Sequence, residues 1–262
     1  MISRRSYRLS IDKNAGQQYV KRDYRSLHGA RDLHYFQLTL KETDLAIGVN
    51  RESYNDDLLT VCEKEVRKLR GDLETYISLH PEFRISFIPV SLLPGAPSLA
   101  LTMARAAFLA GVGPMAAVAG AFAQAIGEKL RNQVRDIIVE NGGDIYICSN
   151  SDRLVSVFAG QSSFSNKIAI KVKAEESPLG ICTSSGTVGP SVSLGKADAV
   201  VIKGHDAALA DAAATGAANR IQCKDDLLRA VDYVKTIKGI TGILAIKGEH
   251  MAAWGSIEIV PI

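Results

Sequence analysis

Cysteine is scarce in this chain, and the four copies are scattered. They stand at Cys62, Cys148, Cys182 and Cys223, and no two of them form a CxxC pair. This spacing argues against a zinc site and against a disulfide-stapled scaffold, and it suits a reducing compartment. Residues 1–31 also lack the apolar segment of a secretory signal peptide. A mitochondrial-type leader is a weaker alternative, because Asp12 and Asp23 interrupt the basic run. We therefore expect a cytoplasmic protein.

Charged side chains are absent from residues 106–127, a run long enough to cross a membrane. The run is mostly alanine and glycine, which are only weakly apolar, and Gly111-Val112-Gly113-Pro114 divides it. This break predicts two core helices, from Ser98 to Ala110 and from Met115 to Arg131, in place of a membrane span. The small residues of the second helix would let another backbone or a flat ligand lie close to it.

Gly111–Ala116 also fits GxGxxA, a dinucleotide-binding fingerprint. That fingerprint should follow a strand, whereas a helical segment precedes it here. Two interpretations remain: a helix N-terminus that binds an anion, or a purely structural connection between two helices.

The length and composition indicate an ordinary globular protein. The chain has 262 residues, of which 47% are hydrophobic and 23% charged, so it needs neither disulfides nor metals to bury a core. Residues 1–31 carry eight basic side chains against two acidic ones. This segment could bind nucleic acid, but its alternation around Tyr7, Leu9 and Ile11 and, more loosely, around Tyr19–Tyr24 favours two strands with a charged outer face. We expect one domain over residues 1–262, with this segment included.

Hydrophobic periodicity predicts an α/β fold, with mixed β-sheets packed against helices. Helices are expected at Tyr54–Leu79, at about Asp206 to Arg220, and at Asp225–Lys235. Strands are expected at Leu33–Thr39, Asp44–Val49, Arg84–Pro89, Leu154–Ala159, Lys167–Val172, Ala199–Lys203, Gly242–Ile246, Met251–Trp254 and Ile257–Val260. His205 and His250 fall in turns, and we assign neither a catalytic role.

The most informative stretch is Val139–Ile147, in which Gly142-Gly143 separates two apolar runs. Glycine packs no side chain in a strand, so the pair marks a turn or a close approach of another backbone or a ligand. Asn141 and Asp144 flank the pair with an amide and a carboxylate. A hairpin turn and a binding loop both fit the stretch by itself.

A second stretch, Gly180–Ser191, contains five hydroxyl side chains and three glycines. Such a loop would offer donors to a phosphate, and Thr183, Ser184, Ser185 and Gly186 form its centre. Cys182 has no histidine or other base near it in the sequence, which argues against a nucleophile.

A third stretch places Asp211 and Thr215 four residues apart, on one face of an alanine-rich helix. A carboxylate and a hydroxyl there suit an oxygen-seeking cation such as Mg²⁺. The polar stripe of an ordinary helix is the alternative.

Together these stretches resemble the signature regions of the ApbE flavin-transferase superfamily. The spellings Val-Glu-Asn-Gly-Gly-Asp-Ile, Gly-Ile-Cys-Thr-Ser-Ser-Gly and Ala-Asp-Ala-Ala-Ala-Thr carry the likeness, and Gly-Pro-Met-Ala-Ala-Val-Ala-Gly-Ala adds to it. The likeness extends to Lys41–Leu45 and His80–Phe83 and is closest to a shorter, uncharacterised branch found in archaea and bacteria.

The resemblance implies a flavin nucleotide and a metal. ApbE proteins bind FAD and Mg²⁺, cleave the pyrophosphate, release AMP and pass FMN to a Thr or Ser of an acceptor protein, whereas some relatives hydrolyse FAD. By this resemblance Asp211 and Thr215 would hold the metal. The flavin nucleotide would lie along two segments, Asn141, Gly142, Gly143 and Asp144 in one and Thr183, Ser184, Ser185 and Gly186 in the other.

One departure from the superfamily pattern stands out. ApbE proteins follow their Ser-Gly with a histidine-containing segment, whereas residues 187–196 contain no histidine. The resemblance therefore assigns no catalytic residue. The first hypothesis is an enzyme, or a degenerate enzyme, acting on FAD with Mg²⁺. The alternative is a non-catalytic accessory protein of sulfur or homocysteine metabolism that uses the same cleft for binding.

Overall fold

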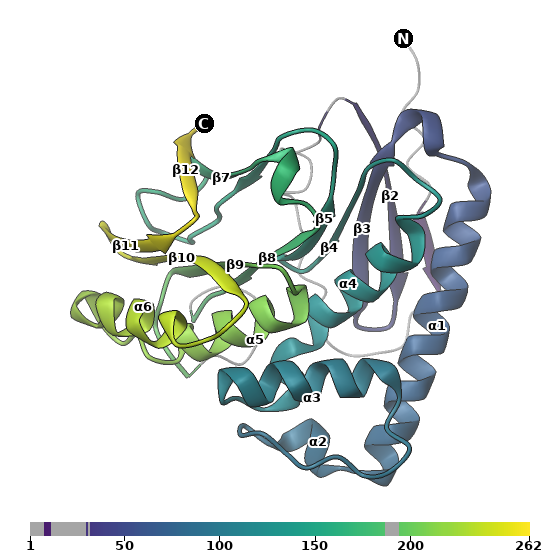
Figure 1. Ribbon diagram of the computed structural model, residues 1–262, viewed down its shortest axis with the longest axis horizontal. Helices are drawn as coiled ribbons and strands as arrows, with labels where there is room; N and C mark the ends of the chain where they lie inside the picture. The colour runs from purple at the N-terminus through teal and green to yellow at the C-terminus, as the bar shows by residue number, and fades with distance from the viewer. Residues whose placement is uncertain (1–7, 12–29, 31, 187–193) are drawn as a thin grey trace.

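Two sheets and one layer of helices form the part of the chain that the structure describes (Figure 1). The structure is a computed structural model, and it describes residues 8–11, 30, 32–186 and 194–262. The helices are α1 (Asp56–Leu79), α2 (Glu82–Ile85), α3 (Ser98–Ala110), α4 (Val118–Leu130), α5 (Ala207–Ala218) and α6 (Leu227–Lys235), with a 3₁₀ helix, η3 (Pro114–Ala117), before α4. The strands are β1 (Arg8–Ile11), β2 (Leu33–Leu40), β3 (Thr43–Asn50), β4 (Ile137–Asn141), β5 (Asp144–Cys148), β6 (Arg153–Ser156), β7 (Ile168–Val172), β8 (Leu179–Ser184), β9 (Ala199–Gly204), β10 (Ile240–Lys247), β11 (His250–Gly255) and β12 (Glu258–Pro261).

The larger sheet has nine strands in the order β1-β2-β3-β4-β5-β8-β9-β10-β11, and the smaller one has the order β12-β7-β6. All neighbouring strands are antiparallel except β1 and β2, which run parallel. The predicted fold class, sheets packed against helices, is confirmed, and short turns join β2 to β3, β4 to β5 and β10 to β11.

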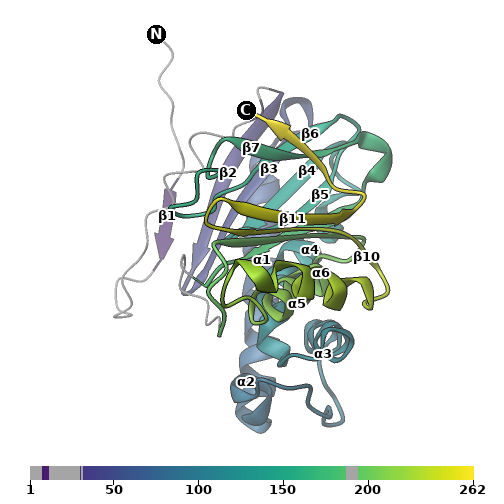
Figure 2. The same cartoon turned by 90° about the vertical axis from the view of Figure 1, so that its left-hand side faces the viewer.

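Both faces of the larger sheet are covered, as the two views in Figures 1 and 2 show. Helices α1, α3, α4, α5 and α6 contribute the large core on one face. On the other face, Ile147, Ile181 and Val201 of the larger sheet pack with Ile170 and Val172 of the smaller sheet. A central strand such as β9 is consequently buried along its whole length.

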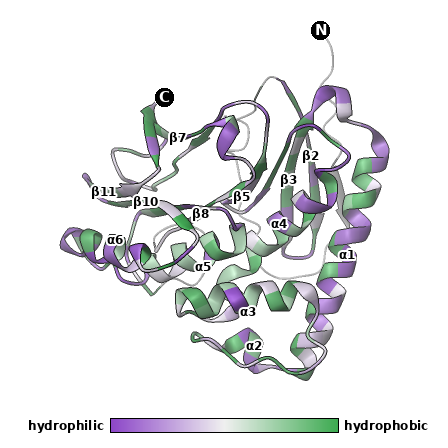
Figure 3. Ribbon diagram, viewed as in Figure 1, coloured by the Kyte–Doolittle hydropathy of each residue, from purple (hydrophilic) through white to green (hydrophobic). Residues whose placement is uncertain are grey.

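Helix α1 confirms the prediction from leucine and valine spacing. The Asn55 side chain caps its start by accepting a hydrogen bond from the Leu58 N–H, 3.2 Å away. Its buried residues recur at helical spacing, which gives the helix the apolar stripe seen in Figure 3. The helix ends before Pro81, as expected.

The strand predicted at Arg84–Pro89 is wrong. Glu82–Ile85 forms one helical turn, α2, because Pro81 is pre-set for a helix start and Phe83 alone is drawn into the core. Ile85, Phe87 and Ile88 stay exposed, so this apolar segment does not contribute to the core.

At the N-terminus, the strand expected around Leu9 is confirmed, since Arg8–Ile11 pairs with Gln37–Leu40. The second strand expected there, around Tyr19–Tyr24, lies outside the described residues.

The charge-free run forms α3 and then η3 with α4, as the Gly-Val-Gly-Pro break predicts. Gly111 closes α3 in the left-handed conformation, with φ 65°. A Cβ on Gly113 would lie only 1.8 Å from the Ser86 carbonyl oxygen, so backbone covers the start of η3. This favours the structural interpretation of the break over an anion site.

Among the described residues, no single helix has the length and apolar character to cross a membrane. The one candidate is a pair, Ser98–Ala110 with Pro114–Leu130, which bends by 104° at the break.

A buried arginine links the N-terminal part of the larger sheet to β6. The Arg153 guanidinium donates to both carboxylate oxygens of Asp32, at 2.9 and 2.8 Å. Its Nη2 lies 3.8 Å from Asp136 Oδ1, which also accepts from the Asn150 N–H at 2.6 Å. The hydrogen bond from Arg153 lowers the pKa of Asp32. Burial raises the pKa of Asp136, but hydrogen bonds from Asn150, Arg135 and Ser149 outweigh it and leave that pKa below its usual value.

This cluster predicts acid sensitivity. Both carboxyl groups have folded-state pKa values below their unfolded ones, so their contribution is present above about pH 4 and is lost as the pH falls through the folded-state values. We expect Asp136→Asn to lower the free energy of unfolding by about 1–3 kcal/mol at pH 7. The variant should also lose less stability than the wild type as the pH falls from 7 to 3. Urea unfolding from pH 3 to 7 measures both effects. Exposed Asp57→Asn is the matched control, and an Asp136→Asn curve parallel to that of the wild type would contradict the prediction.

Candidate functional site

Helix α5 places Asp211 in the middle of the molecule. The Asp206 side chain caps the helix by accepting from the Leu209 N–H at 2.8 Å, and alanines on every side let the helix lie close to its neighbours. Ala207 is the closest point of approach. A Cβ on Gly180 of β8 would lie 2.4 Å from the Ala207 Cα, and one on Gly120 of α4 would lie 2.3 Å from its carbonyl oxygen.

The Asp211 carboxylate is buried at the crossing of α5 and α4. Its Oδ2 accepts a hydrogen bond from the Gly120 N–H at 2.9 Å. Burial raises the pKa of Asp211 well above its usual value, and the negative charge of Asp144 raises it further. The N–H groups of Gly120 and Ala119 act in the opposite direction. A buried carboxylate whose ionisation a second carboxylate disfavours is an arrangement that a bound cation would stabilise.

Asp144 reaches this place from the other side, at the first position of β5. It pairs across the hairpin with Asn141 and, in the other direction, with Cys182 of β8. The charge of Asp144 raises the pKa of Asp211, so the structure brings the two carboxyl groups within electrostatic range, although 66 residues separate them in sequence. The resemblance grouped Asp144 with the nucleotide segment, whereas the structure also relates it to Asp211.

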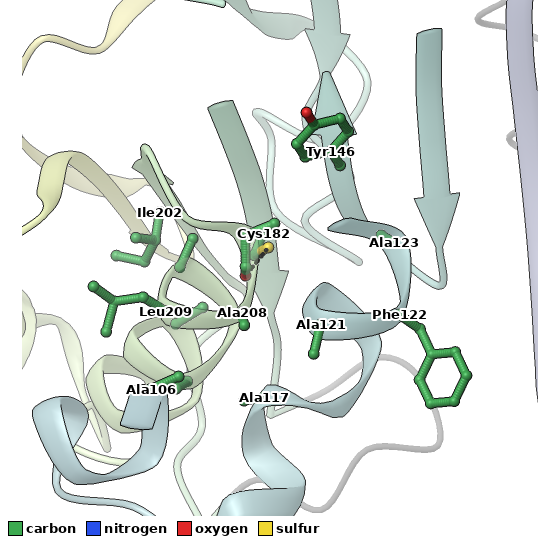
Figure 4. Packing of buried hydrophobic residues seen from close by; sticks show 14 of the residues in the cluster. Ala106, Ala117, Ala121, Phe122, Ala123, Tyr146, Cys182, Ile202, Ala208 and Leu209 are labelled. Atoms are coloured by element: carbon green, nitrogen blue, oxygen red, sulfur yellow. Dashed lines mark hydrogen bonds between the residues drawn. The ribbon is translucent and has the colours of Figure 1, made fainter. Parts of the chain in front are cut away.

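Cys182 completes this buried group. Its sulfur donates to the Ala207 carbonyl oxygen at 3.2 Å, within the alanine-rich packing that Figure 4 shows around Ala208. Burial, followed by the charges of Asp144 and Asp211, raises the thiol pKa well above its usual value. A neutral, fully buried thiol agrees with the argument against nucleophilic catalysis.

Gly142 and Gly143 form the two-residue turn of the β4–β5 hairpin. Their φ angles are 73° and 115°, and such positive values explain why glycine stands at both positions. The hairpin interpretation is therefore confirmed. A ligand could still approach, because the nearest atom to a Cβ on Gly143 would be the Thr183 carbonyl oxygen, 3.8 Å away.

Asn141 holds this hairpin against α4. Its Nδ2 donates to the Ala119 carbonyl oxygen at 3.2 Å. Asn141 thus binds the carbonyl of Ala119, and Asp211 binds the N–H of Gly120. These two backbone groups belong to adjacent residues of α4. The sequence predicted that the small residues there would admit another backbone or a flat ligand, and α5 is a backbone that lies against them.

The prediction of a loop over Gly180–Ser191 is partly wrong. Thr183 and Ser184 belong to β8 and pair with Val201 and Val200 of β9, because the run before them, Leu179–Cys182, is buried apolar strand. Ser185 and Gly186 follow the strand, and the Gly186 N–H donates to the Ala197 carbonyl oxygen at 2.9 Å. Residues 187–193 lie outside the described part.

Thr215 lies one turn after Asp211 on α5 and is half-buried. No group of three or more His, Cys, Asp or Glu side chains suited to a metal occurs within the described ranges. A cation at Asp211 would therefore need hydroxyl, backbone or ligand oxygens beside the carboxylates. Thr215 could be proposed from sequence because it stands four residues after Asp211 on a helix. No local sequence pattern predicted that the Gly120 N–H would bind Asp211.

The architecture is that of the ApbE flavin transferases. The flavin transferase ApbE from Vibrio cholerae superposes with a TM-score of 0.56 over 86% of this chain and 97% of that chain, at 11% identity. The flavinyl transferase ApbE from Pseudomonas stutzeri, in its apo form, gives 0.53 over 85% and 94%, at 12% identity. At these identities the likeness establishes the fold.

The family follows from sequence. A family model described as AbpE bacteria matches residues 25–233, and the chain belongs to this family. The UPF0280 protein of Methanococcus maripaludis strain C7 is 40% identical over 232 residues, which cover 86% of this chain and 92% of that protein. The UPF0280 protein of Methanosarcina acetivorans is 37% identical over 225 residues, covering 85% and 86%. The resemblance to a branch of the ApbE superfamily is confirmed.

Proposed function

We propose that the protein binds FAD together with Mg²⁺ where the β4–β5 hairpin, the end of β8, α4 and α5 meet. There it would act on the pyrophosphate, either cleaving FAD or transferring FMN to a Thr or Ser of an acceptor protein. The observation that carries this proposal is the buried Asp211, which has Asp144 close by and a raised pKa. Membership of the family and the fold of the flavin transferases support the choice of ligand.

Asp211 and Thr215 would hold the cation, with Asp144 as a further source of carboxylate oxygen. Mg²⁺ prefers oxygen ligands and keeps open positions for water and phosphate. When bound, the cation supplies positive charge that offsets the charge of the bridging phosphates. The role of the protein would be to orient these oxygens. The Gly120 N–H holds one carboxylate oxygen of Asp211, and helix α5 sets the spacing between Asp211 and Thr215.

The nucleotide would lie along the hairpin turn and the residues that end β8. Asn141, Gly142, Gly143 and Asp144 provide the first segment, and Thr183, Ser184, Ser185 and Gly186 provide the second. The turn and β8 are neighbours: Asp144 pairs with Cys182, and a Cβ on Gly143 would lie 3.8 Å from the Thr183 carbonyl oxygen. The absence of side chains at the turn leaves its backbone open to close approach by phosphate or ribose.

A second candidate function is binding without chemistry. Residues 187–196 contain no histidine, and this departs from the superfamily pattern at the segment expected to supply a catalytic base. An accessory protein of sulfur or homocysteine metabolism would use the same carboxylates and hairpin to bind a phosphorylated ligand.

The test is a thermal-shift titration of the full chain with FAD, FMN, ADP and ATP, each with and without Mg²⁺. A ligand at a hundred times its dissociation constant stabilises by about 2.7 kcal/mol, which shifts the unfolding temperature of a domain of this size by several degrees. We expect the largest shift with FAD plus Mg²⁺. AMP release then measures cleavage, and flavin fluorescence bound to an acceptor protein measures transfer.

The two candidates differ in these readouts. A Mg²⁺-dependent shift with FAD and release of AMP would support the enzyme. A shift with no AMP release, either alone or with an acceptor protein present, would favour the binding protein. No shift with any of the four nucleotides would contradict the proposed ligand.

A further inference from the structure

Six large apolar side chains are exposed at the end of the molecule that α2, the segment after it and α3 form. We call them the α2–α3 patch: Ile85 (71% exposed), Phe87 (65%), Ile88 (68%), Leu101 (50%), Phe108 (73%) and Leu109 (43%). Figures 1 and 2 both place these elements together, on the side of the helix layer away from the sheets. Single exposed leucines are normal on a protein surface, but a group of six on adjoining elements is not.

The two halves of the patch adjoin each other through backbone. A Cβ on Gly113, just beyond the end of α3, would lie 1.8 Å from the Ser86 oxygen and 3.1 Å from the Phe87 Cα. Phe87 therefore lies against the chain that leaves α3. On α3, Leu101, Phe108 and Leu109 fall on the face opposite the buried one, because helical spacing places them within about 100° of each other.

The size of the patch fits a protein–protein interface. A large apolar residue exposes about 200 Å² when fully accessible, so the observed fractions correspond to about 700 Å². The largest apolar patch of a typical monomer is about 300–600 Å², and each partner of a standard interface contributes about 800 Å².

We propose that the α2–α3 patch is the interface of a two-fold symmetric dimer of this chain. Such an interface must be complementary to itself. The patch is mainly apolar, so the apolar surface of one copy would be buried against the same surface of the other copy. Its exposed charges are of both signs: Arg105 lies between Leu101 and Phe108 on the outer face of α3, and Glu82 and Arg84 lie on α2. A two-fold axis can place Arg105 of each copy opposite Glu82 of the other.

The test is the mass of the full chain in solution by light scattering after size exclusion, from about 1 to 100 μM, the range in which standard-sized interfaces assemble. We expect a dimer for the wild type and a monomer for the double variant Ile88→Asp/Phe108→Asp. Both side chains are exposed, so the variant should retain the circular dichroism and unfolding temperature of a folded monomer. Leu228→Asp is the matched control, since Leu228 is 69% exposed on α6, outside the patch, and this variant should remain a dimer.

A wild type that stays monomeric at 100 μM would overturn the proposal, as would a dimer that survives in the double variant. The same proteins are tested for sedimentation with vesicles of phosphatidylcholine and phosphatidylglycerol. A monomeric wild type that binds these vesicles, with binding lost in the double variant, would assign the patch to a lipid surface and reject the dimer.

Discussion

Asp211→Asn is expected to remove the Mg²⁺-dependent part of FAD binding and to leave the metal-free protein at least as stable as the wild type. The variant retains the shape of the side chain and an oxygen that can accept from the Gly120 N–H, but it loses the negative charge. Without metal, burial and the charge of Asp144 disfavour the ionised form of Asp211, so a neutral amide should be tolerated at this position. In the proposed site the ionised carboxylate would be a metal ligand, and loss of even an outer-shell partner typically costs about 10–100-fold in metal affinity.

The measurement is the unfolding temperature of the variant with FAD, as Mg²⁺ rises from zero to millimolar. Asp206→Asn is the matched control: it makes the same substitution on the same helix, and asparagine caps a helix about as well as aspartate. An Asp211→Asn protein that keeps the Mg²⁺ response of the wild type would remove Asp211 from the metal site. A variant that unfolds at a much lower temperature without metal would show that the carboxylate serves the fold.

The elements of this site could be predicted because each leaves a local signal. Periodic leucines and valines mark α1, and two apolar runs mark β4 and β5 on either side of Gly142-Gly143. Alanines with Asp206 before them mark α5. In each case the residues that determine the element lie within a few positions of one another, so propensity and pattern point to the same answer.

No local sequence pattern predicted how these elements come together at the site. Asp144 and Asp211 come together only because β5, β8 and α5 pack against one another, and the N–H that binds Asp211 belongs to a third element, α4. The hydroxyl-rich stretch was misjudged for a related reason. Thr183 and Ser184 look like loop residues, but strand pairing with β9 overrides their polarity.

The sequence pattern also could not predict which apolar side chains are exposed. Ile85, Phe87 and Ile88 are strand-forming apolar residues, yet they are exposed at the end of a helical turn and in the segment after it. A short apolar segment forms a strand only if a neighbouring strand is available to pair with it. Pro81 and Pro89 bracket this segment, and its backbone instead meets Gly113. The same three residues that misled the strand prediction supply half of the proposed interface.

The second large effect is expected at the crossing of α4 and α5. Gly120→Ala should destabilise the protein by about 1–3 kcal/mol or more, as overpacking of a tight core does. The added Cβ would lie 2.3 Å from the Ala207 oxygen and 2.8 Å from the Asp211 Cβ, so the two helices must move apart. Because the Gly120 N–H also binds Asp211, the same movement should weaken Mg²⁺ binding.

Gly71→Ala is the matched control, because it makes the identical substitution inside a helix where, among the described residues, no atom of another element lies within 4 Å of the new Cβ. There alanine should stabilise by about 0.5–1 kcal/mol, since it restricts the unfolded chain and suits the helix. Urea unfolding of the two variants should therefore give changes of opposite sign. If Gly120→Ala is as stable as Gly71→Ala, α4 and α5 are not in close contact, and the geometry that places the Gly120 N–H on Asp211 is wrong. If Gly120→Ala is destabilised but retains the full Mg²⁺ response, the close approach serves packing alone and the cation is held without it.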